Sequence, residues 1–183
     1  MSFFAFVRAN SRWLLASFLL VAFSGFGQTF FIGLSAGALR TEFGLTHGEF
    51  GGIYMAATLG SAFCLPWVGK SLDHFPISQV AAVVMLSLAL FCAAMASVSA
   101  VWMLFVVIFG LRLSGQGMMS NTSMTAVSRW FEAQRGKATA IASLGFPFAE
   151  AIMPISFVIL TSLFGWRAGW WVAAGLMVVA VLP

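Results

Sequence analysis

Two ionisable side chains, Arg112 and Glu150, lie deep inside long apolar stretches of this sequence. Arg112 falls within residues 101–124 and Glu150 within residues 138–164, 11 and 12 positions from the respective starts. In helices that rise ~1.5 Å per residue, both would lie ~17 Å deep, near the midplane of a hydrocarbon core ~30 Å thick. A charge there costs ~2.5–3.5 kcal/mol on insertion scales. Each side chain therefore needs a partner, a water-filled cavity or a ligand.

An arginine and a glutamate at similar depth could link the movement of a proton to that of an anion. Arginine keeps its charge at physiological pH, whereas a glutamate takes up a proton when its surroundings disfavour the charged form. Protonation of Glu150 would release Arg112 to bind a carboxylate substrate, which couples the two movements. The alternative is a permanent Arg112–Glu150 ion pair between neighbouring antiparallel helices. Such a pair would brace the fold and does not exclude transport.

Polar residues around Arg112 form a stripe on an otherwise apolar segment. Arg112, Gln116, Ser120 and Ser123 recur at helical spacing, and Asn121 lies beside them. We interpret the stripe as the wall of a substrate cavity. The alternative is a helix held by interhelical hydrogen bonds, with the arginine bound to backbone carbonyls.

Other polar residues in the apolar stretches are further candidates for the cavity wall. Gln28 and Tyr54 lie in the first two stretches, where each either lines the cavity or bonds to another helix. Pro147 and Pro154 share a helical face with Glu150 and can kink that helix. The carbonyls that they free could hold a proton or a cation beside the acid.

The composition identifies the elements that must position these residues as membrane-spanning helices. Of 183 residues, 61% are hydrophobic and 8% are charged, and the mean hydropathy is +1.01, unlike a soluble domain. An all-α membrane protein is expected, because a lipid-exposed backbone must satisfy its own hydrogen bonds. Six transmembrane helices are predicted, at residues 12–37, 48–68, 79–98, 101–125, 138–163 and 167–183. A capping box at 46–49 and a cap at Ser99 mark two of the starts.

The basic residues predict the orientation of these helices. Six of them fall on one side of the membrane, namely Arg8, Arg12, Lys70, Arg129, Arg135 and Lys137. Arg40 and Arg167 fall on the other side. The positive-inside rule then places the N-terminus and the loops at 70–78 and 126–137 in the cytoplasm. Basic residues spread over alternate loops also argue against a nucleic-acid-binding surface.

The sequence gives little support to an enzyme. It contains no HExxH motif, no pair of intramembrane aspartates and no serine with a histidine at matching depth. We therefore predict no catalytic residues, no cofactor and no metal site.

The loop between the second and third helices carries Gly69 and Asp73. A glycine there lets two helices approach closely, and an aspartate can cap a helix or pair with a cation at the membrane face. The alternative is an ordinary polar turn.

Several motifs together resemble the N-terminal six-helix half of a major facilitator superfamily transporter. Gly69 and Asp73 are similar to the signature between helices two and three, and Arg112 with the glycines after it is similar to a helix-four signature. The segments 128–131 (Ser-Arg-Trp-Phe) and 135–138 (Arg-Gly-Lys-Ala) resemble bacterial monocarboxylate and oxalate–formate porters, as does Gly-Trp-Arg at 165–167. The resemblance covers essentially the whole chain.

The resemblance implies a twelve-helix fold in which this chain forms one bundle of inverted three-helix repeats. Substrate would bind at the midplane between two bundles, with Gln28, Tyr54, Arg112, Gln116, Asn121 and Glu150 on the cavity side. Gly69, Asp73, Arg129 and Arg135 would form a gating loop. The substrates would be small organic anions moved with protons, and the location a bacterial inner membrane.

The expected function is therefore secondary active transport by alternating access. The sixth helix stops at Pro183 without a basic anchor, so we expect the C-terminal half to be absent or a second copy to replace it. Two alternatives stay open: a non-transporting membrane interaction subunit, and a half-size transporter acting as a homodimer.

Overall fold

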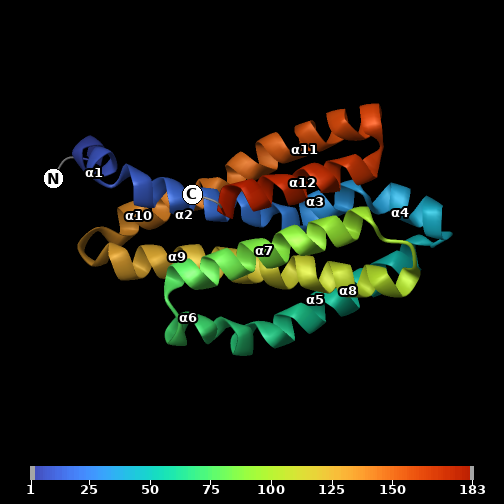
Figure 1. The fold of residues 1–183 in the computed structure, drawn as a ribbon, viewed down its shortest axis with the longest axis horizontal. Coiled ribbons are helices and arrows are strands. Elements are labelled where there is room, and N and C mark those ends of the chain that lie inside the picture. Colours follow the sequence, from blue (N-terminus) through green and yellow to red (C-terminus); the bar gives the residue numbers. More distant parts are fainter. Residues whose placement is uncertain (1–2, 182–183) are drawn as a thin grey trace.

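The computed structural model describes residues 3–181, which are helical almost throughout and contain no β-strand (Figure 1). The first group of helices comprises α1 Phe3–Ala9, α2 Ser11–Phe23, η1 Ser24–Gly27, α3 Thr29–Leu34, α4 Ala36–Phe43, α5 His47–Gly69 and α6 Ser71–His74. The second comprises α7 Ile77–Ala96, α8 Val101–Leu111, η2 Arg112–Met119, α9 Ser120–Trp130, η3 Glu132–Gln134, α10 Arg135–Ser143, α11 Gly145–Phe164 and α12 Trp166–Val181. The all-helical prediction is thus confirmed for these residues.

Four helical stretches are long and apolar enough to cross a membrane: His47–His74, Ile77–Ala96, Val101–Trp130 and Glu132–Phe164. The pair Phe3–Ala9 and Ser11–Gly27 makes a fifth if it is taken as one span, although it bends by 85°. Trp166–Val181 is apolar but shorter. Positions 182 and 183 of the predicted sixth span lie outside the described residues. The six-span organisation stays a prediction.

The first predicted span is interrupted rather than continuous. A 3₁₀ turn, η1, follows α2, and the chain is extended at Gln28 (φ −91°, ψ 159°) before α3 begins. The helical path then continues through α4 to Phe43, beyond the predicted end at residue 37. Glycines at 25 and 27 weaken the helix there, so polar backbone is available in the middle of the span.

The fourth predicted span is also irregular. Its middle, η2, is a π-helix, in which each hydrogen bond reaches one residue further than in an α-helix. It begins at Arg112, and the helix continues as α9 to Trp130 instead of ending near residue 125. In the fifth span Pro147 lies in the first turn of α11, and Pro154 lies inside that helix. The helical stretch 132–164 is not broken at either proline.

One of the two predicted caps is confirmed. Thr46 and Glu49 form the reciprocal capping box at the start of α5. The cap at Ser99 is wrong, because Ala100 is the N-cap of α8 and makes no side-chain cap. The Ser99 hydroxyl instead donates to the Met103 sulfur at 3.6 Å.

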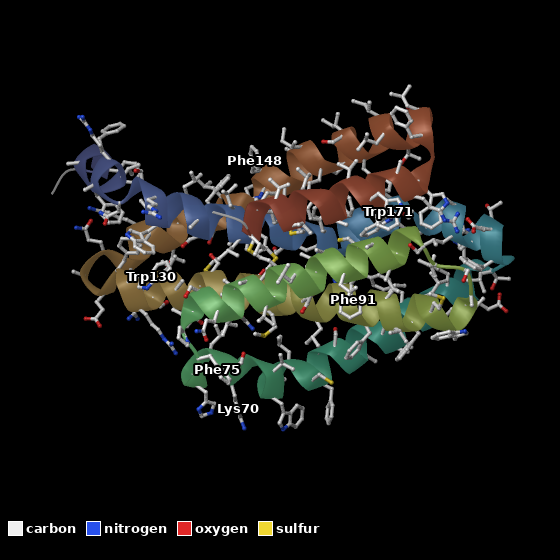
Figure 2. All side chains as sticks on the ribbon, in the orientation of Figure 1. Lys70, Phe75, Phe91, Trp130, Phe148 and Trp171 are labelled. Carbon is white, nitrogen blue, oxygen red and sulfur yellow. The ribbon has the colours of Figure 1, made fainter. Side chains whose placement is uncertain are left out.

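The helices pack around the first, third and fourth spans. α2 contacts α9, α10 and α11, α7 runs along α12, and η1 lies on η2. Trp170 is buried within this packing, and its indole N–H donates to the Ser35 hydroxyl at 2.8 Å. Exposed apolar side chains such as Phe148 and Trp171 point outward, as lipid-facing residues do (Figure 2).

Candidate functional site

The irregular segments η1 and η2 cross each other with backbone against backbone. A Cβ placed on Gly115 would lie 2.6 Å from the Gly27 Cα, and one on Gly27 would lie 2.7 Å from the Gly115 Cα. Real Cβ atoms do not make contacts this short, so both positions require glycine. The crossing brings Thr29 of the first span to Arg112 of the fourth.

Arg112, Thr29 and Tyr54 form a polar cluster from three different spans, called here the Arg112 cluster. The Arg112 Nη1 donates to the Thr29 Oγ1 at 3.1 Å. The Tyr54 hydroxyl also bonds that oxygen, at 2.9 Å, and the guanidinium carbon lies 5.7 Å from the Tyr54 ring centroid. The arginine is therefore held by a hydroxyl and an aromatic ring, and neither contact neutralises its charge.

The Arg112 cluster keeps donor groups that nothing in the described residues uses. The Tyr54 hydroxyl donates its proton to the Thr29 oxygen, so the proton of the Thr29 hydroxyl stays available for another acceptor. The Arg112 Nε is buried without a hydrogen-bond partner among residues 3–181, and so is the Thr58 hydroxyl. A buried polar atom left unpaired costs about 1–3 kcal/mol. A polar ligand or water that reached these atoms would remove that cost.

A small cavity of about 90 Å³ lies beside these unpaired atoms. Its lining comes from α5 and η2 and comprises Thr58, Ser61, Ala62, Leu65, Arg112, Leu113, Gln116 and Gly117. Space of this size, with several polar partners, suits a water molecule or the polar head of a small ligand. Gln116, predicted for the cavity wall, does line this cavity.

The alternative of a permanent Arg112–Glu150 ion pair does not hold in this structure. Within residues 3–181, the ion pairs join Arg129 to Asp73 and Arg167 to Glu42. Glu150 is exposed on α11. The physical reason is that the first span lies between the two helices. Gly25 of η1 faces α11, while Gly27 faces η2.

The remaining predicted cavity residues lie in two places. The Gln28 amide donates to the Ser24 hydroxyl at 3.4 Å within its own span, at the interruption after η1. It therefore does not bond to another helix. Asn121 is exposed and lines a polar depression of about 390 Å³ together with Arg129 and Arg135. The structure thus places Asn121 with the predicted gating residues and apart from the Arg112 cluster.

The predicted gating residues meet at the end of the molecule where α6 and α10 lie, called here the α6 end (Figure 1). The Arg129 Nη2 lies 3.0 Å from the Asp73 Oδ1, and its Nη1 donates to the Leu72 carbonyl at 2.8 Å. Arg135 donates to the Ser128 carbonyl at 3.3 Å. The close helix approach predicted at Gly69 is wrong, because a Cβ there would meet no atom within 4 Å.

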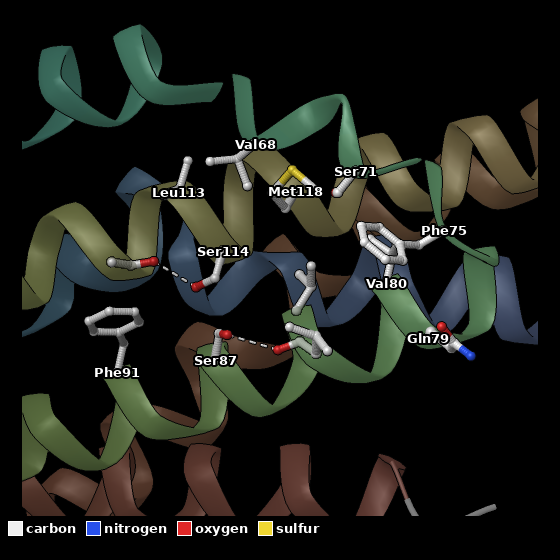
Figure 3. Close-up of a pocket in the computed structure, with 13 residues that line it drawn as sticks. Val68, Ser71, Phe75, Gln79, Val80, Ser87, Phe91, Leu113, Ser114 and Met118 are labelled. Atoms are coloured by element: carbon white, nitrogen blue, oxygen red, sulfur yellow. Dashed lines mark hydrogen bonds between the residues drawn. The ribbon is translucent and has the colours of Figure 1, made fainter. Parts of the chain in front are cut away.

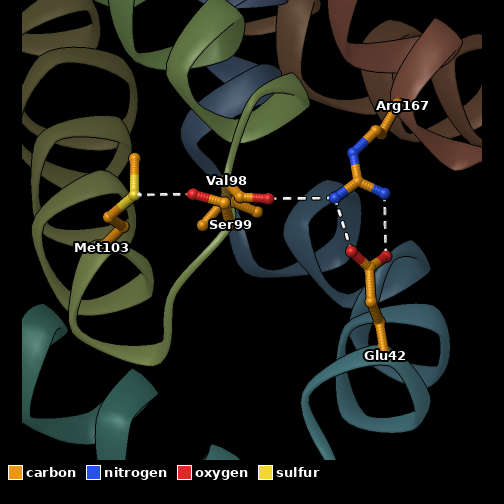
Figure 4. Close-up of polar contacts among 5 residues, drawn as sticks. All are labelled: Glu42, Val98, Ser99, Met103 and Arg167. Carbon is orange, nitrogen blue, oxygen red and sulfur yellow. Dashed lines mark hydrogen bonds and ion pairs between the residues drawn. The ribbon is translucent and has the colours of Figure 1, made fainter.

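A second ion pair, which the sequence reasoning missed, closes the opposite end, called here the α4 end (Figure 4). Arg167 binds both carboxylate oxygens of Glu42, at 2.8 and 2.5 Å, and donates to the Val98 carbonyl at 2.9 Å. Its guanidinium carbon also lies 4.5 Å from the Trp166 ring centroid. These hydrogen bonds from Arg167 lower the pKa of the Glu42 carboxyl below its ordinary value. The signal that could have predicted this pair is the position of a basic residue, Arg167, and an acidic residue, Glu42, near the ends of predicted spans.

Comparison with known families identifies the chain. The family model described as Major Facilitator Superfamily matches residues 17–183, which is most of the chain. Comparisons with curated proteins and with solved structures return no match.

Proposed function

The chain belongs to the Major Facilitator Superfamily, whose members are membrane transporters, and we propose that it moves small organic anions, monocarboxylates among them, by alternating access. The observation that carries the proposal is the Arg112 cluster. A permanent positive charge, an unpaired Nε and a free hydroxyl proton lie together in the middle of apolar spans. These are the groups that a carboxylate needs, since each of its oxygens accepts hydrogen bonds.

The size of the neighbouring cavity favours a small anion. The cavity beside Arg112 holds about 90 Å³, which suits the carboxylate head of a small anion. Gln116 lines it as a further hydrogen-bonding group, whereas the Ser61 hydroxyl already donates to the Thr58 carbonyl at 2.8 Å. The resemblance to bacterial monocarboxylate and oxalate–formate porters points to the same class of substrate.

Proton coupling through Glu150 is the second part of the proposal. Glu150 is exposed, and Pro154, four positions later, has no N–H to donate to the Glu150 carbonyl. The acid and this carbonyl together could hold a proton. Pairing of Glu150 with Arg112 would then require the first span to move out from between their helices.

Gating by the α6 end completes the cycle. The Arg129–Asp73 pair ties the loop after α5 to the end of α9. We expect it to break when that side opens, and the positive-inside rule makes that side cytoplasmic.

The test is uptake of radiolabelled acetate, lactate and oxalate into proteoliposomes that contain the protein. Arg112→Gln removes charge-assisted hydrogen bonds worth about 1.5–3 kcal/mol each, so kcat/KM should fall about 10- to 100-fold. Arg112→Lys keeps the charge but loses the two-pronged geometry. Its kcat/KM should therefore lie between that of the wild-type protein and that of Arg112→Gln. Arg40→Gln, which removes an arginine outside the cluster, is the matched control. Equal uptake by Arg112→Gln and Arg40→Gln would refute anion binding at Arg112.

A further inference from the structure

Two parts of the molecule take no part in the proposed transport cycle. One is the largest cavity described, about 490 Å³, which is bounded by α5, α6, α7 and η2 (Figure 3). The hydroxyls of Ser87 and Ser114, which line it, already donate to carbonyls of their own spans, at 2.8 and 2.6 Å. The interior of this cavity therefore identifies no particular ligand. The other part is α1, whose surroundings do point to a partner.

The helix α1 lies at the α6 end and turns away from the direction of the first span (Figure 1). The bend between α1 and the helical segment Ser11–Gly27 is 85°. The first span does not need α1 to cross a membrane, because the path from Ser11 to Phe43 has about 30 residues, or about 45 Å of helix. A hydrocarbon core is only ~30 Å thick. When the first span crosses a bilayer, α1 therefore lies nearly parallel to the membrane surface.

Packing against the loop between the fourth and fifth spans fixes which face of α1 points outward. The Phe6 ring is buried and meets the Phe131 ring edge-on, with the ring centroids 5.5 Å apart. The Asn10 side-chain amide donates to the Phe6 carbonyl at 2.9 Å at the end of the helix. The inner face of α1 is thus held by the protein, and its outer face keeps one orientation relative to the spans.

The outer face of α1 combines exposed aromatic rings with basic side chains. Phe4 is 83% exposed and Phe3 is exposed as well. Arg8 is exposed and lies four positions after Phe4, on the same face of the helix. Arg12, at the start of α2, is also exposed, and within residues 3–181 neither arginine has a hydrogen bond or an ion pair. This combination suits the border between hydrocarbon and headgroups, where apolar rings are buried and long basic side chains reach the phosphates.

Two tryptophans beside α1 mark the level of that border. Trp13 and Trp130 are both exposed, and their ring centroids lie 4.8 Å apart. Trp130 lies at the same end of the molecule as α10 (Figure 2). Exposed tryptophans gather where a membrane meets water. Since Trp13 directly follows Arg12 and Trp130 directly precedes Phe131, α1 lies at this level too.

The charge around α1 favours an anionic partner. The sequence contains no aspartate or glutamate before Glu42. Glu132 lines the hollow of about 230 Å³ beside Phe6, but among the described residues it forms no ion pair with Arg8 or Arg12. Basic side chains at a membrane surface attract anionic phospholipids. The two arginines are therefore free to contact phosphate groups.

We propose that α1 is an interfacial helix that binds the headgroups of anionic phospholipids through Arg8 and Arg12. The exposed phenylalanines of α1 lie among the upper parts of the acyl chains. Through the contact of Phe6 with Phe131, the helix ties the loop between the fourth and fifth spans to the membrane surface. The proposal does not depend on which anion the protein transports.

Quenching of a fluorophore on α1 by doxyl-labelled lipids tests the proposal in the full protein. Phe4→Cys, made together with Cys64→Ala, leaves one reactive thiol for a bimane label, because Cys92 is buried. The protein is reconstituted in phosphatidylcholine vesicles that contain increasing amounts of phosphatidylglycerol or phosphatidylcholine with a doxyl group near the ester. Half-maximal quenching should need about 10- to 30-fold less of the phosphatidylglycerol, since each arginine adds about a fivefold preference.

Variants of the basic residues separate headgroup binding from general attraction. The double variant Arg8→Gln, Arg12→Gln should lose the preference for phosphatidylglycerol, and Arg8→Lys, Arg12→Lys should keep it. Lys137→Gln is the matched control, because Lys137 is an exposed basic residue at the same end, and it should leave the preference unchanged.

Three results would overturn the proposal. A label that neither lipid quenches would place α1 in water and overturn its interfacial position. Equal quenching by the two lipids in the protein with both arginines would overturn headgroup binding. An equal loss of preference in Lys137→Gln and in the double glutamine variant would overturn the assignment of that binding to Arg8 and Arg12.

Discussion

The two ends of the molecule are each closed by an arginine–carboxylate pair, but the two pairs differ in strength. At the α4 end, Arg167 binds both oxygens of Glu42 and also a backbone carbonyl, and the side chains are 39% and 35% exposed. At the α6 end, Arg129 also donates to a backbone carbonyl, that of Leu72, but it contacts only one oxygen of Asp73, and the side chains are 45% and 70% exposed. Two-pronged, less exposed pairs are the stronger class. The comparison indicates that the α4 end is the firmer closure and the α6 end opens more readily in this conformation.

The largest loss of stability is expected when the ion pair at the α4 end is removed. Arg167→Ala removes two bonds to Glu42 and the bond to the Val98 carbonyl, so the free energy of unfolding should fall by about 1–2 kcal/mol. Thermal unfolding in detergent micelles, followed by tryptophan fluorescence, measures the change. Arg40→Ala is the control, and an equal loss in both variants would remove the distinction between the two ends.

Acid should weaken the α4 closure by titrating Glu42. Because the folded-state pKa of Glu42 is lowered, its stabilisation is complete above the unfolded pKa of about 4.3 and is lost as the pH falls through the folded value. As the pH falls below about 4.3, the unfolding temperature of the wild-type protein should therefore drop more steeply than that of Glu42→Gln. Parallel pH profiles in the two proteins would show that the pair contributes no measurable pH dependence.

The smallest effect on stability is expected at the α6 end. Arg129→Ala breaks an exposed pair and should lower the free energy of unfolding by about 0–1 kcal/mol. Transport should nevertheless change, because the closed state loses its contact; Asp73→Asn should act in the same direction. Stability and initial uptake rates of both variants can be measured in one preparation. A stability loss as large as that of Arg167→Ala would reverse the comparison.

Much of the fold follows from local patterns in the sequence, whereas most of the site does not. Hydropathy locates the apolar helices, and the Thr46–Glu49 spacing predicts a cap that the structure contains. The break at Gln28 and the π-helix at Arg112 depend on how two spans cross, which no local pattern reports. The same holds for the missing Arg112–Glu150 pair, since depth along each helix says nothing about a third helix between them.

The Arg112 cluster shows which part of a site can be predicted. A charged residue inside a long apolar stretch is rare because it is costly in a membrane, so the sequence alone identifies Arg112 as a candidate. Tyr54 is also a candidate from its type, but Thr29, which lies 83 residues before Arg112 and bonds both side chains, is not. Thr29 is an ordinary residue by type, and only its place after the interrupted helix gives it a role.

The glycine crossing of η1 and η2 has a mechanical consequence. Helices usually interlock through side chains that fit between one another, so one can turn on the other only if those side chains repack. At Gly27 and Gly115 no side chains intervene, so the two backbones touch directly. The same two spans are also joined further along, where α2 packs on α9 and the Ser123 hydroxyl donates to the Ser17 carbonyl at 2.8 Å. A change in the angle between the first and fourth spans would pivot on the glycine contact, beside the arginine, and would have to break this second contact.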